Sequence, residues 1–389
     1  MKDAHMTESH PDPAVTIDAD YPGGNILVDG IDGDVVRLRP DLRDTTTWWF
    51  YWNFRVRGAA GRTLTFAFSG QDPIGVRGPA VSTDRGAAWA WLGAETVKDG
   101  SFRYTFAEDC TEARFAFTYP YLENDLDTFL ARHNLNGHIQ TAELCTTAQG
   151  LTVCRLHAGR QDAASCPVVA LFCRHHACET MANFVLEGVF KTIAGDTSEG
   201  RWLRRHASIV AVPLVDKDGV ERGDQGKNRA PHDHNRDYTA ESIYPEVRAI
   251  RAFLPEWAGE NLALGLDLHC PWIRGGSGGP GDNEQVFFVG GPNADVWTRA
   301  QELSAVLESI QTGPIVYSPR HDMPYGVGWN TSSGTCSQWL ASFPGEPAAA
   351  TLEIPYANAG GTPVTPDTAR RFGHDLARAI HAYLEAKSR

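Results

Sequence analysis

Residues 167–195 decide the fold of this chain and read PVVALFCRHHACETMANFVLEGVFKTIAG. Residues 167–173 form an apolar run with the length of a buried strand, and residues 179–195 place apolar side chains on one face at helical spacing. The polar corner between them holds His175, His176 and Glu179. An imidazole and a carboxylate three residues apart, His176 and Glu179, can chelate one zinc ion if a third ligand arrives from elsewhere. His175 is expected to be a supporting or surface group.

Similar apolar runs alternate with amphipathic segments from about residue 150 to the end of the chain. Expected strands cover residues 168–173, 208–212, 262–268, 285–289 and 350–354; expected helices cover 179–193, 241–253, 293–310 and 365–386. This alternation predicts an α/β fold in which a mixed sheet carries helices on both faces. Such sheets bind ligands at the carboxyl ends of their strands.

The first third of the chain follows a different pattern. Apolar and polar residues alternate from Phe50 to Val56, and short segments of the same kind recur between glycine-rich and proline-rich turns. We therefore expect a small all-β sandwich domain ahead of the α/β domain. The predicted division is a polar N-terminal tail at 1–24, the sandwich at 25–125, a helical linker at 126–150 and the α/β domain at 151–389.

The composition excludes several classes of protein. The chain has 389 residues, 42% of them hydrophobic, and a formal net charge of −13. That charge argues against binding to nucleic acid or to anionic membranes. No apolar run reaches the length of a membrane span, and the first twenty residues contain no apolar signal core. The eight cysteines form no Cys-x-x-Cys pair, so reduced thiols and a cytoplasmic location are expected.

Two later strands end in residues that suit a hydrolytic zinc site. His269 closes the run at 262–268 and is the candidate third ligand. Glu353 interrupts the apolar run at 350–354, where a carboxylate is costly to bury without a partner. Glu353 is thus either half of a structural ion pair or a general base that takes a proton from a zinc-activated water.

A polar stretch at 226–237 contains two arginines, Arg229 and Arg236. Arginine suits bidentate recognition of a carboxylate, and a second arginine can stabilise developing oxyanion charge. Alternatively, this stretch is a solvated loop. Its cluster of His232, Asp233 and His234 also competes weakly as a metal site.

The order of these motifs resembles the zinc carboxypeptidase family, in particular its cytosolic carboxypeptidase branch. The resemblance covers about residues 25–385 and includes the aromatic segment at 48–52. It implies one zinc ion per chain, held by His176, Glu179 and His269, with Glu353 as the base. It further implies that Arg229 polarises the scissile carbonyl. It assigns the terminal carboxylate of the substrate to Asn235 with Arg236, and the orientation of a zinc-bound histidine to Asp233.

The chain departs from the family pattern at several positions. Ala177 and Cys178 replace the usual Pro-Gly between the first two ligands. Ser337 stands where members that trim glutamate carry a basic residue, for which Arg274 or Arg320 could substitute. Tyr325 is the candidate substrate-binding, proton-donating tyrosine, whereas alignment by spacing offers Trp329.

These features predict a zinc-dependent metallocarboxypeptidase that hydrolyses the C-terminal amide bond of a peptide or acylated amino acid. The expected partner is a peptide or small amide with a free carboxylate, with no nucleic acid and no membrane. One alternative keeps the fold and the zinc but acts as an amidohydrolase or deacylase on a small N-acyl amino acid or specialised metabolite. A second alternative is a non-catalytic binding protein built on the aromatic-rich β half.

Overall fold

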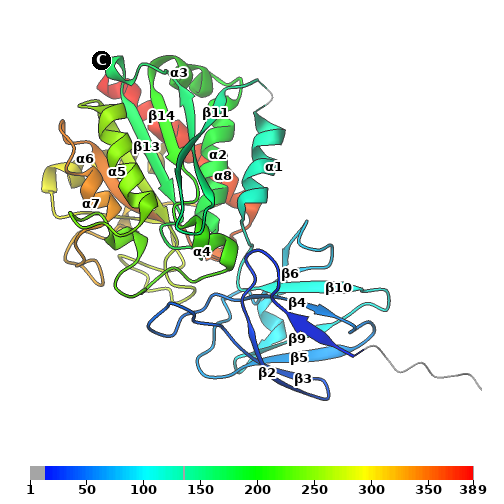
Figure 1. Cartoon of the computed structure of the whole chain (residues 1–389). Helices are drawn as coiled ribbons and strands as arrows, with labels where there is room; N and C mark the ends of the chain where they lie inside the picture. Colours follow the sequence, from blue (N-terminus) through cyan, green and yellow to red (C-terminus); the bar gives the residue numbers. More distant parts are fainter. Residues whose placement is uncertain (1–13, 135, 389) are drawn as a thin grey trace, which may run out of the picture.

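The computed structural model describes residues 14–134 and 136–388. Figure 1 shows an α/β region with a β-sandwich region packed against one end of it. No helix in these two ranges is long and apolar enough to cross a membrane. All eight cysteines are free thiols. The predicted fold class, a mixed α/β sheet preceded by a β-sandwich, is confirmed.

A seven-stranded mixed sheet forms the centre of the α/β region, in the order β11-β12-β14-β13-β15-β17-β16. The four central strands run parallel to one another, and the flanking strands are antiparallel to their neighbours. All four parallel strands therefore end at the same edge of the sheet. The strands are β11 (Ile139–Thr146), β12 (Thr152–Gly159), β13 (Val168–Cys173), β14 (Ser208–Val212), β15 (Leu262–His269), β16 (Phe287–Val289) and β17 (Ala348–Glu353).

Helices cover both faces of this sheet because the central strands are apolar on both sides. In β13, Val169 and Leu171 face the core beneath α2, α6 and α8, whereas Ala170 and Phe172 face the core beneath α5 and α7. The helices are α1 (Glu123–His133), α2 (Met181–Ala194), α3 (Ser198–His206), α4 (Lys217–Arg222), α5 (Pro245–Ala258), α6 (Ala294–Ile310), α7 (Cys336–Leu340) and α8 (Pro366–Lys387). A small hairpin, β18 (Asn358–Ala359) and β19 (Thr362–Pro363), precedes α8.

Two five-stranded sheets form the sandwich, in the orders β1-β4-β10-β6-β7 and β2-β3-β5-β9-β8. Alternate residues of their strands point inward and build an aromatic core in which Phe66 and Phe102 stack with ring centroids 4.9 Å apart. The strands are β1 (Thr16–Asp18), β2 (Leu27–Asp32), β3 (Val35–Arg39), β4 (Asn53–Arg57), β5 (Thr63–Phe68), β6 (Ala80–Ser82), β7 (Ala90–Trp91), β8 (Val97–Lys98), β9 (Ser101–Thr105) and β10 (Glu112–Ala116).

Three segments differ from their predicted structure. Part of the predicted polar tail forms β1, which pairs with β4 and places Asp18 2.7 Å from Arg55; residues 1–13 of that tail lie outside the described residues. The predicted helical linker holds most of α1 but also β11, an edge strand of the large sheet. Much of β11 is exposed, so it lacks the continuous apolar run of a buried strand. Helix α2 begins at Met181, which leaves Glu179 in the corner before it.

Direct contacts join the sandwich to the edge of the sheet where β13, β15 and β17 end. The side-chain oxygen of Gln225 accepts hydrogen bonds from the backbone N–H groups of Phe50 and Tyr51, at 3.2 and 2.8 Å. The Trp272 ring packs against Trp49 and Phe50, with centroids 4.8 and 5.1 Å apart. The sandwich therefore supplies part of the wall around this edge.

Candidate metal centre and substrate pocket

A buried arginine holds the corner between β13 and α2. Arg174 adopts a left-handed backbone conformation with φ of 65°, and its guanidinium donates to the carbonyl oxygens of Ala177 and Tyr121, both at 2.9 Å. It also donates to the Asn183 side chain at 3.0 Å. These hydrogen bonds satisfy one carbonyl group of the non-helical corner and tie the corner to the segment before α1 and to α2. The corner is thereby fixed with His176 facing a cavity.

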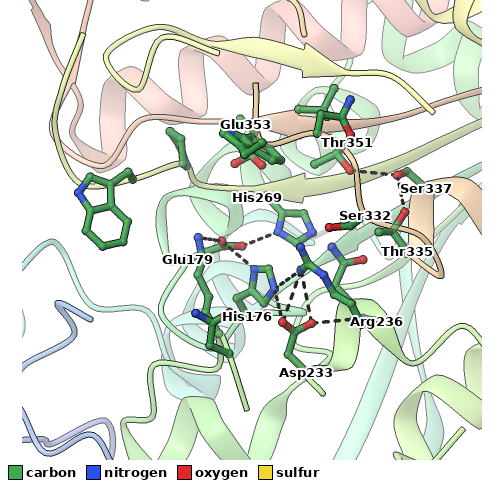
Figure 2. A pocket seen from close by; sticks show the side chains of 18 of the residues that line it. His176, Glu179, Asp233, Arg236, His269, Ser332, Thr335, Ser337, Thr351 and Glu353 are labelled. Carbon is green, nitrogen blue, oxygen red and sulfur yellow. Dashed lines mark hydrogen bonds and ion pairs between the residues drawn. The ribbon is translucent and has the colours of Figure 1, made fainter. Parts of the chain in front are cut away.

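Three predicted ligands converge on one point in that cavity, which has a volume of about 370 Å³ (Figure 2). His176 Nδ1 lies 2.9 Å from Glu179 Oε1, and His269 Nδ1 lies 2.7 Å from Glu179 Oε2. One ligating atom from each residue lies within 4.8 Å of the other two. All three side chains are buried. They come from the corner after β13 and from the end of β15.

The chemistry of these donors fits a zinc ion. His269 Nε2 lies 2.6 Å from Asp267 Oδ2, and His176 Nε2 lies 3.5 Å from Asp233 Oδ2. A metal-bound histidine commonly donates its second N–H to such a carboxylate, which leaves Nδ1 as the ligand. The Nδ1 lone pair of His269 then faces Glu179 Oε2, an atom to which no described group donates a hydrogen bond. Two facing electron-pair donors need either a proton or a metal ion between them, and this set of two imidazoles and a carboxylate is one that zinc prefers.

Asp267 extends this arrangement behind the metal position, and the sequence analysis missed it. Its Oδ1 lies 2.7 Å from His175 Nδ1, and His175 Nε2 lies 2.8 Å from the Tyr238 hydroxyl. Burial would raise the pKa of Asp267, but attraction to His175 and His269 holds it below its usual range. His175 is thus a buried supporting group. The missed signal was the spacing of Asp267 and His269, since residues two apart on a strand share a face.

Glu353 ends β17 beside His269, the candidate metal ligand that ends β15. The two strands are in register so that Glu353 is paired with His269, and Figure 2 shows both side chains at the cavity. Burial raises the pKa of Glu353 to about 7. No described group donates a hydrogen bond to its Oε2 atom. A carboxyl group poised near neutral pH, with a free oxygen facing the cavity, can accept and return a proton.

Asn235 and Arg236 also line the cavity. The Asn235 side-chain oxygen accepts a hydrogen bond from the Cys336 N–H at 3.0 Å, which fixes the side chain in place. Arg236 Nη1 lies 3.5 Å from Asp233 and 3.1 Å from His176 Nε2, and about a third of its side chain is exposed. The guanidinium therefore stands next to the metal position with room to receive an anion.

The structure does not bring Arg229 into the cavity, contrary to the position implied by the family resemblance. Its guanidinium is buried among three carboxylates, Asp44 at 2.7 Å, Asp216 at 2.5 Å and Asp224 at 3.0 Å. Lys227 lines the cavity instead, with its Nζ 2.6 Å from Glu179 Oε1 and donating to the Cys270 carbonyl at 3.1 Å. The two cations are two residues apart in a loop, so no periodicity in the sequence distinguishes them.

Tyr325 and the two histidines that flank Asp233 do not line the cavity. Tyr325 is exposed, donates to the Thr331 carbonyl at 3.3 Å and does not line the cavity, whereas Trp329 does. His232 lies 2.6 Å from Asp237, and His234 lies 3.6 Å from Glu246. These histidines contact different carboxylates, so the competing metal cluster is not assembled.

Comparison with known proteins gives relatives of two kinds. No protein-family model matches the sequence. An uncharacterized protein of Zymomonas mobilis is 26% identical over 383 residues, which cover 92% of this chain and 94% of that protein. Cytosolic carboxypeptidase 2 of the mouse is 25% identical over 279 residues, which cover 61% of this chain. The match takes in 32% of the mouse protein, so this chain corresponds to about a third of its length.

Solved structures show the same fold over nearly the whole chain. The metallo-carboxypeptidase of Burkholderia cenocepacia superposes with a TM-score of 0.78 and 22% identity, covering 96% of this chain and 100% of that one. The metallo-carboxypeptidase of Pseudomonas aeruginosa, solved with (2-guanidinoethylmercapto)succinic acid, gives 0.77 and 21%, covering 95% and 99%. The resemblance seen in the sequence is confirmed: this chain has the zinc carboxypeptidase fold and is distantly similar to the cytosolic carboxypeptidases and to bacterial metallo-carboxypeptidases.

Proposed function

We propose that this protein is a zinc-dependent metallocarboxypeptidase that hydrolyses the C-terminal amide bond of a peptide or acylated amino acid. The convergence of His176, Glu179 and His269 in one cavity with Glu353 and Arg236 carries the proposal. A zinc ion held by the three ligands would supply a Lewis acid and lower the pKa of a coordinated water to about 7. The Pseudomonas structure, a complex with a succinic acid derivative, supports recognition of a carboxylate by this fold.

The side chains of the cavity divide the reaction between them. Arg236 and Asn235 hold the terminal carboxylate of the substrate and so place the last amide bond beside Glu353. Glu353 takes a proton from the attacking water as the water oxygen bonds to the carbonyl carbon. Glu353 then gives the proton to the amide nitrogen as the C–N bond breaks, which releases a new carboxylate and an amine. Burial favours the protonated form of Glu353, which helps it to hold the proton between the two transfers.

Lys227 takes the role that the family resemblance implied for Arg229. A cation is needed where negative charge develops on the carbonyl oxygen, and Lys227 lies beside the metal ligand Glu179. Arg229 is held by three carboxylates outside the cavity. Arg229 then acts by fixing the loop that presents Lys227 and Arg236.

Two measurements test this function. Purified protein should contain one zinc ion per chain and cleave an N-acylated dipeptide, but not the same dipeptide with its terminal carboxylate amidated. Arg236→Ala should weaken turnover of the free-carboxylate substrate, mainly through KM. Cleavage of the amidated and free peptides at equal rates would instead indicate an amidohydrolase, and zinc-loaded protein that cleaves neither would contradict the proposal.

A further inference from the structure

One part of the cavity is lined by neutral hydrogen-bonding side chains. We call it the hydroxyl compartment, and it consists of Ser332, Thr335, Ser337, Gln338 and Thr351. The Thr351 hydroxyl donates to Ser337 Oγ at 3.1 Å, and the Thr335 and Ser337 hydroxyls lie 3.3 Å apart. Figure 2 shows its labelled hydroxyl residues grouped on the side of Arg236 away from Glu179. Ser337 and Thr351 are buried and form its inner wall.

The position of this compartment identifies which part of a substrate it would contact. This step rests on the proposed function, in which Arg236 holds the terminal carboxylate and the scissile carbonyl lies at the three metal ligands. Only the α-carbon of the terminal residue separates its amide nitrogen from its carboxylate, so that carbon is held between the two groups. The rest of the peptide must leave by the opening, which the exposed side chains of Asn228 and Trp329 mark. The terminal side chain is left facing the hydroxyl compartment.

The charges around the compartment disfavour an anionic side chain. Lys227 lies against Glu179 at 2.6 Å, and Arg236 is occupied by the terminal carboxylate. Arg274 pairs with Asp72 at 2.9 Å, and Arg320 donates to His321 at 2.8 Å; neither lines the cavity. Within the described chain, no further lysine or arginine lines the cavity to balance a glutamate side chain. An unpaired charge buried there would pay a large desolvation penalty.

We propose that the hydroxyl compartment selects substrates whose C-terminal residue has a neutral, hydrogen-bonding side chain: glutamine, asparagine, serine or threonine. Hydroxyl groups donate or accept as needed, so they can match both the carbonyl and the amino group of a side-chain amide. An acidic side chain of the same shape offers only acceptors and a net charge. An apolar side chain of the same shape leaves the hydroxyls without a ligand partner.

Matched peptides test this selection. N-acylated dipeptides ending in glutamine or glutamate, and in asparagine, aspartate or leucine, differ little in shape within each set. We expect kcat/KM to be about tenfold or more higher for glutamine than for glutamate, and for asparagine than for aspartate or leucine. Binding of the same peptides to the zinc-loaded Glu353→Gln variant, measured by calorimetry, should give the same order.

We expect a variant with a cation in the hydroxyl compartment to shift the preference from glutamine toward glutamate. Ser332→Lys should lower the glutamine-to-glutamate ratio at least about tenfold, because the half-buried side chain at 332 faces the cavity. Ser333→Lys is the control, since Ser333 is exposed and does not line the cavity. Glutamate, lysine or leucine peptides cleaved as well as glutamine peptides would overturn the selection and leave the proposed function intact. Absence of cleavage for every free-carboxylate peptide would instead count against the proposed function.

Discussion

Replacing Asp267 by asparagine should weaken zinc binding without removing a zinc ligand. The Asp267 carboxylate is fully buried and lies 2.7 Å from His175 and 2.6 Å from His269. Asparagine keeps one acceptor oxygen but turns an NH₂ group toward one of the two imidazoles. If that imidazole is His269, its tautomer no longer favours Nδ1 as the ligand. Loss of such a supporting carboxylate costs about 10–100-fold in metal affinity, or about 1.4–2.7 kcal/mol.

Competition between the protein and a chromophoric chelator measures this change in zinc affinity directly. Asp237→Asn is the matched control, because Asp237 is also fully buried and lies 2.6 Å from a histidine, His232, that is not a predicted ligand. The control should keep the wild-type zinc affinity. Denaturant unfolding of both zinc-free variants separates loss of fold from loss of metal. A zinc affinity of Asp267→Asn within about threefold of the wild type, or one matched by the control, would refute the reasoning.

Three further changes test other parts of the site and the fold. Glu353→Gln should retain zinc and lose about 10²–10⁴-fold in kcat, and undiminished turnover would exclude Glu353 as the base. Lys227→Met should also retain zinc but lower kcat by about 10²-fold, because the cation beside the carbonyl is removed; an unchanged kcat would eliminate that role. Burial raises the pKa of Asp322 from 3.8 to about 6, so the folded protein binds this proton more tightly than the unfolded chain does. The stability of the wild type relative to Asp322→Asn should therefore fall as pH rises from 4 to 7. The difference in unfolding free energy should change by up to about 3 kcal/mol, and a difference that is constant with pH would contradict this.

The sequence predicts best those site residues that end or follow buried strands. His176, His269 and Glu353 each stand next to an apolar run, and parallel strands bring such positions to one edge of the sheet. The positions of Lys227 and Arg229, the two cations of one loop, could not be predicted in this way. Arg229 is held partly by Asp44, which is 185 residues away in the chain and belongs to the sandwich region. Nothing in the local pattern of the loop indicates that distant partner.

The lack of a local sequence signal also explains why strands β1 and β11 were not predicted. Strand β1 is short and polar and is held to β4 by pairing and by arginine–aspartate contacts, so no hydrophobic period marks it. Strand β11 lies at the edge of the large sheet with much of its surface exposed. A sequence indicates a strand through the side chains that it buries, and strands that bury few of them give a weak signal.

The pairing of His269 with Glu353 on adjacent parallel strands sets how far the proposed proton acceptor stands from the proposed zinc ion. Neighbouring strands are spaced about 4.8 Å apart by their backbone hydrogen bonds, whatever side chains they carry. Substitutions among the helices that cover the sheet can therefore alter thermal tolerance while leaving the spacing of these two side chains unchanged. An insertion of one residue within β17 would instead turn Glu353 to the opposite face of the sheet. The carboxylate would then no longer stand beside His269.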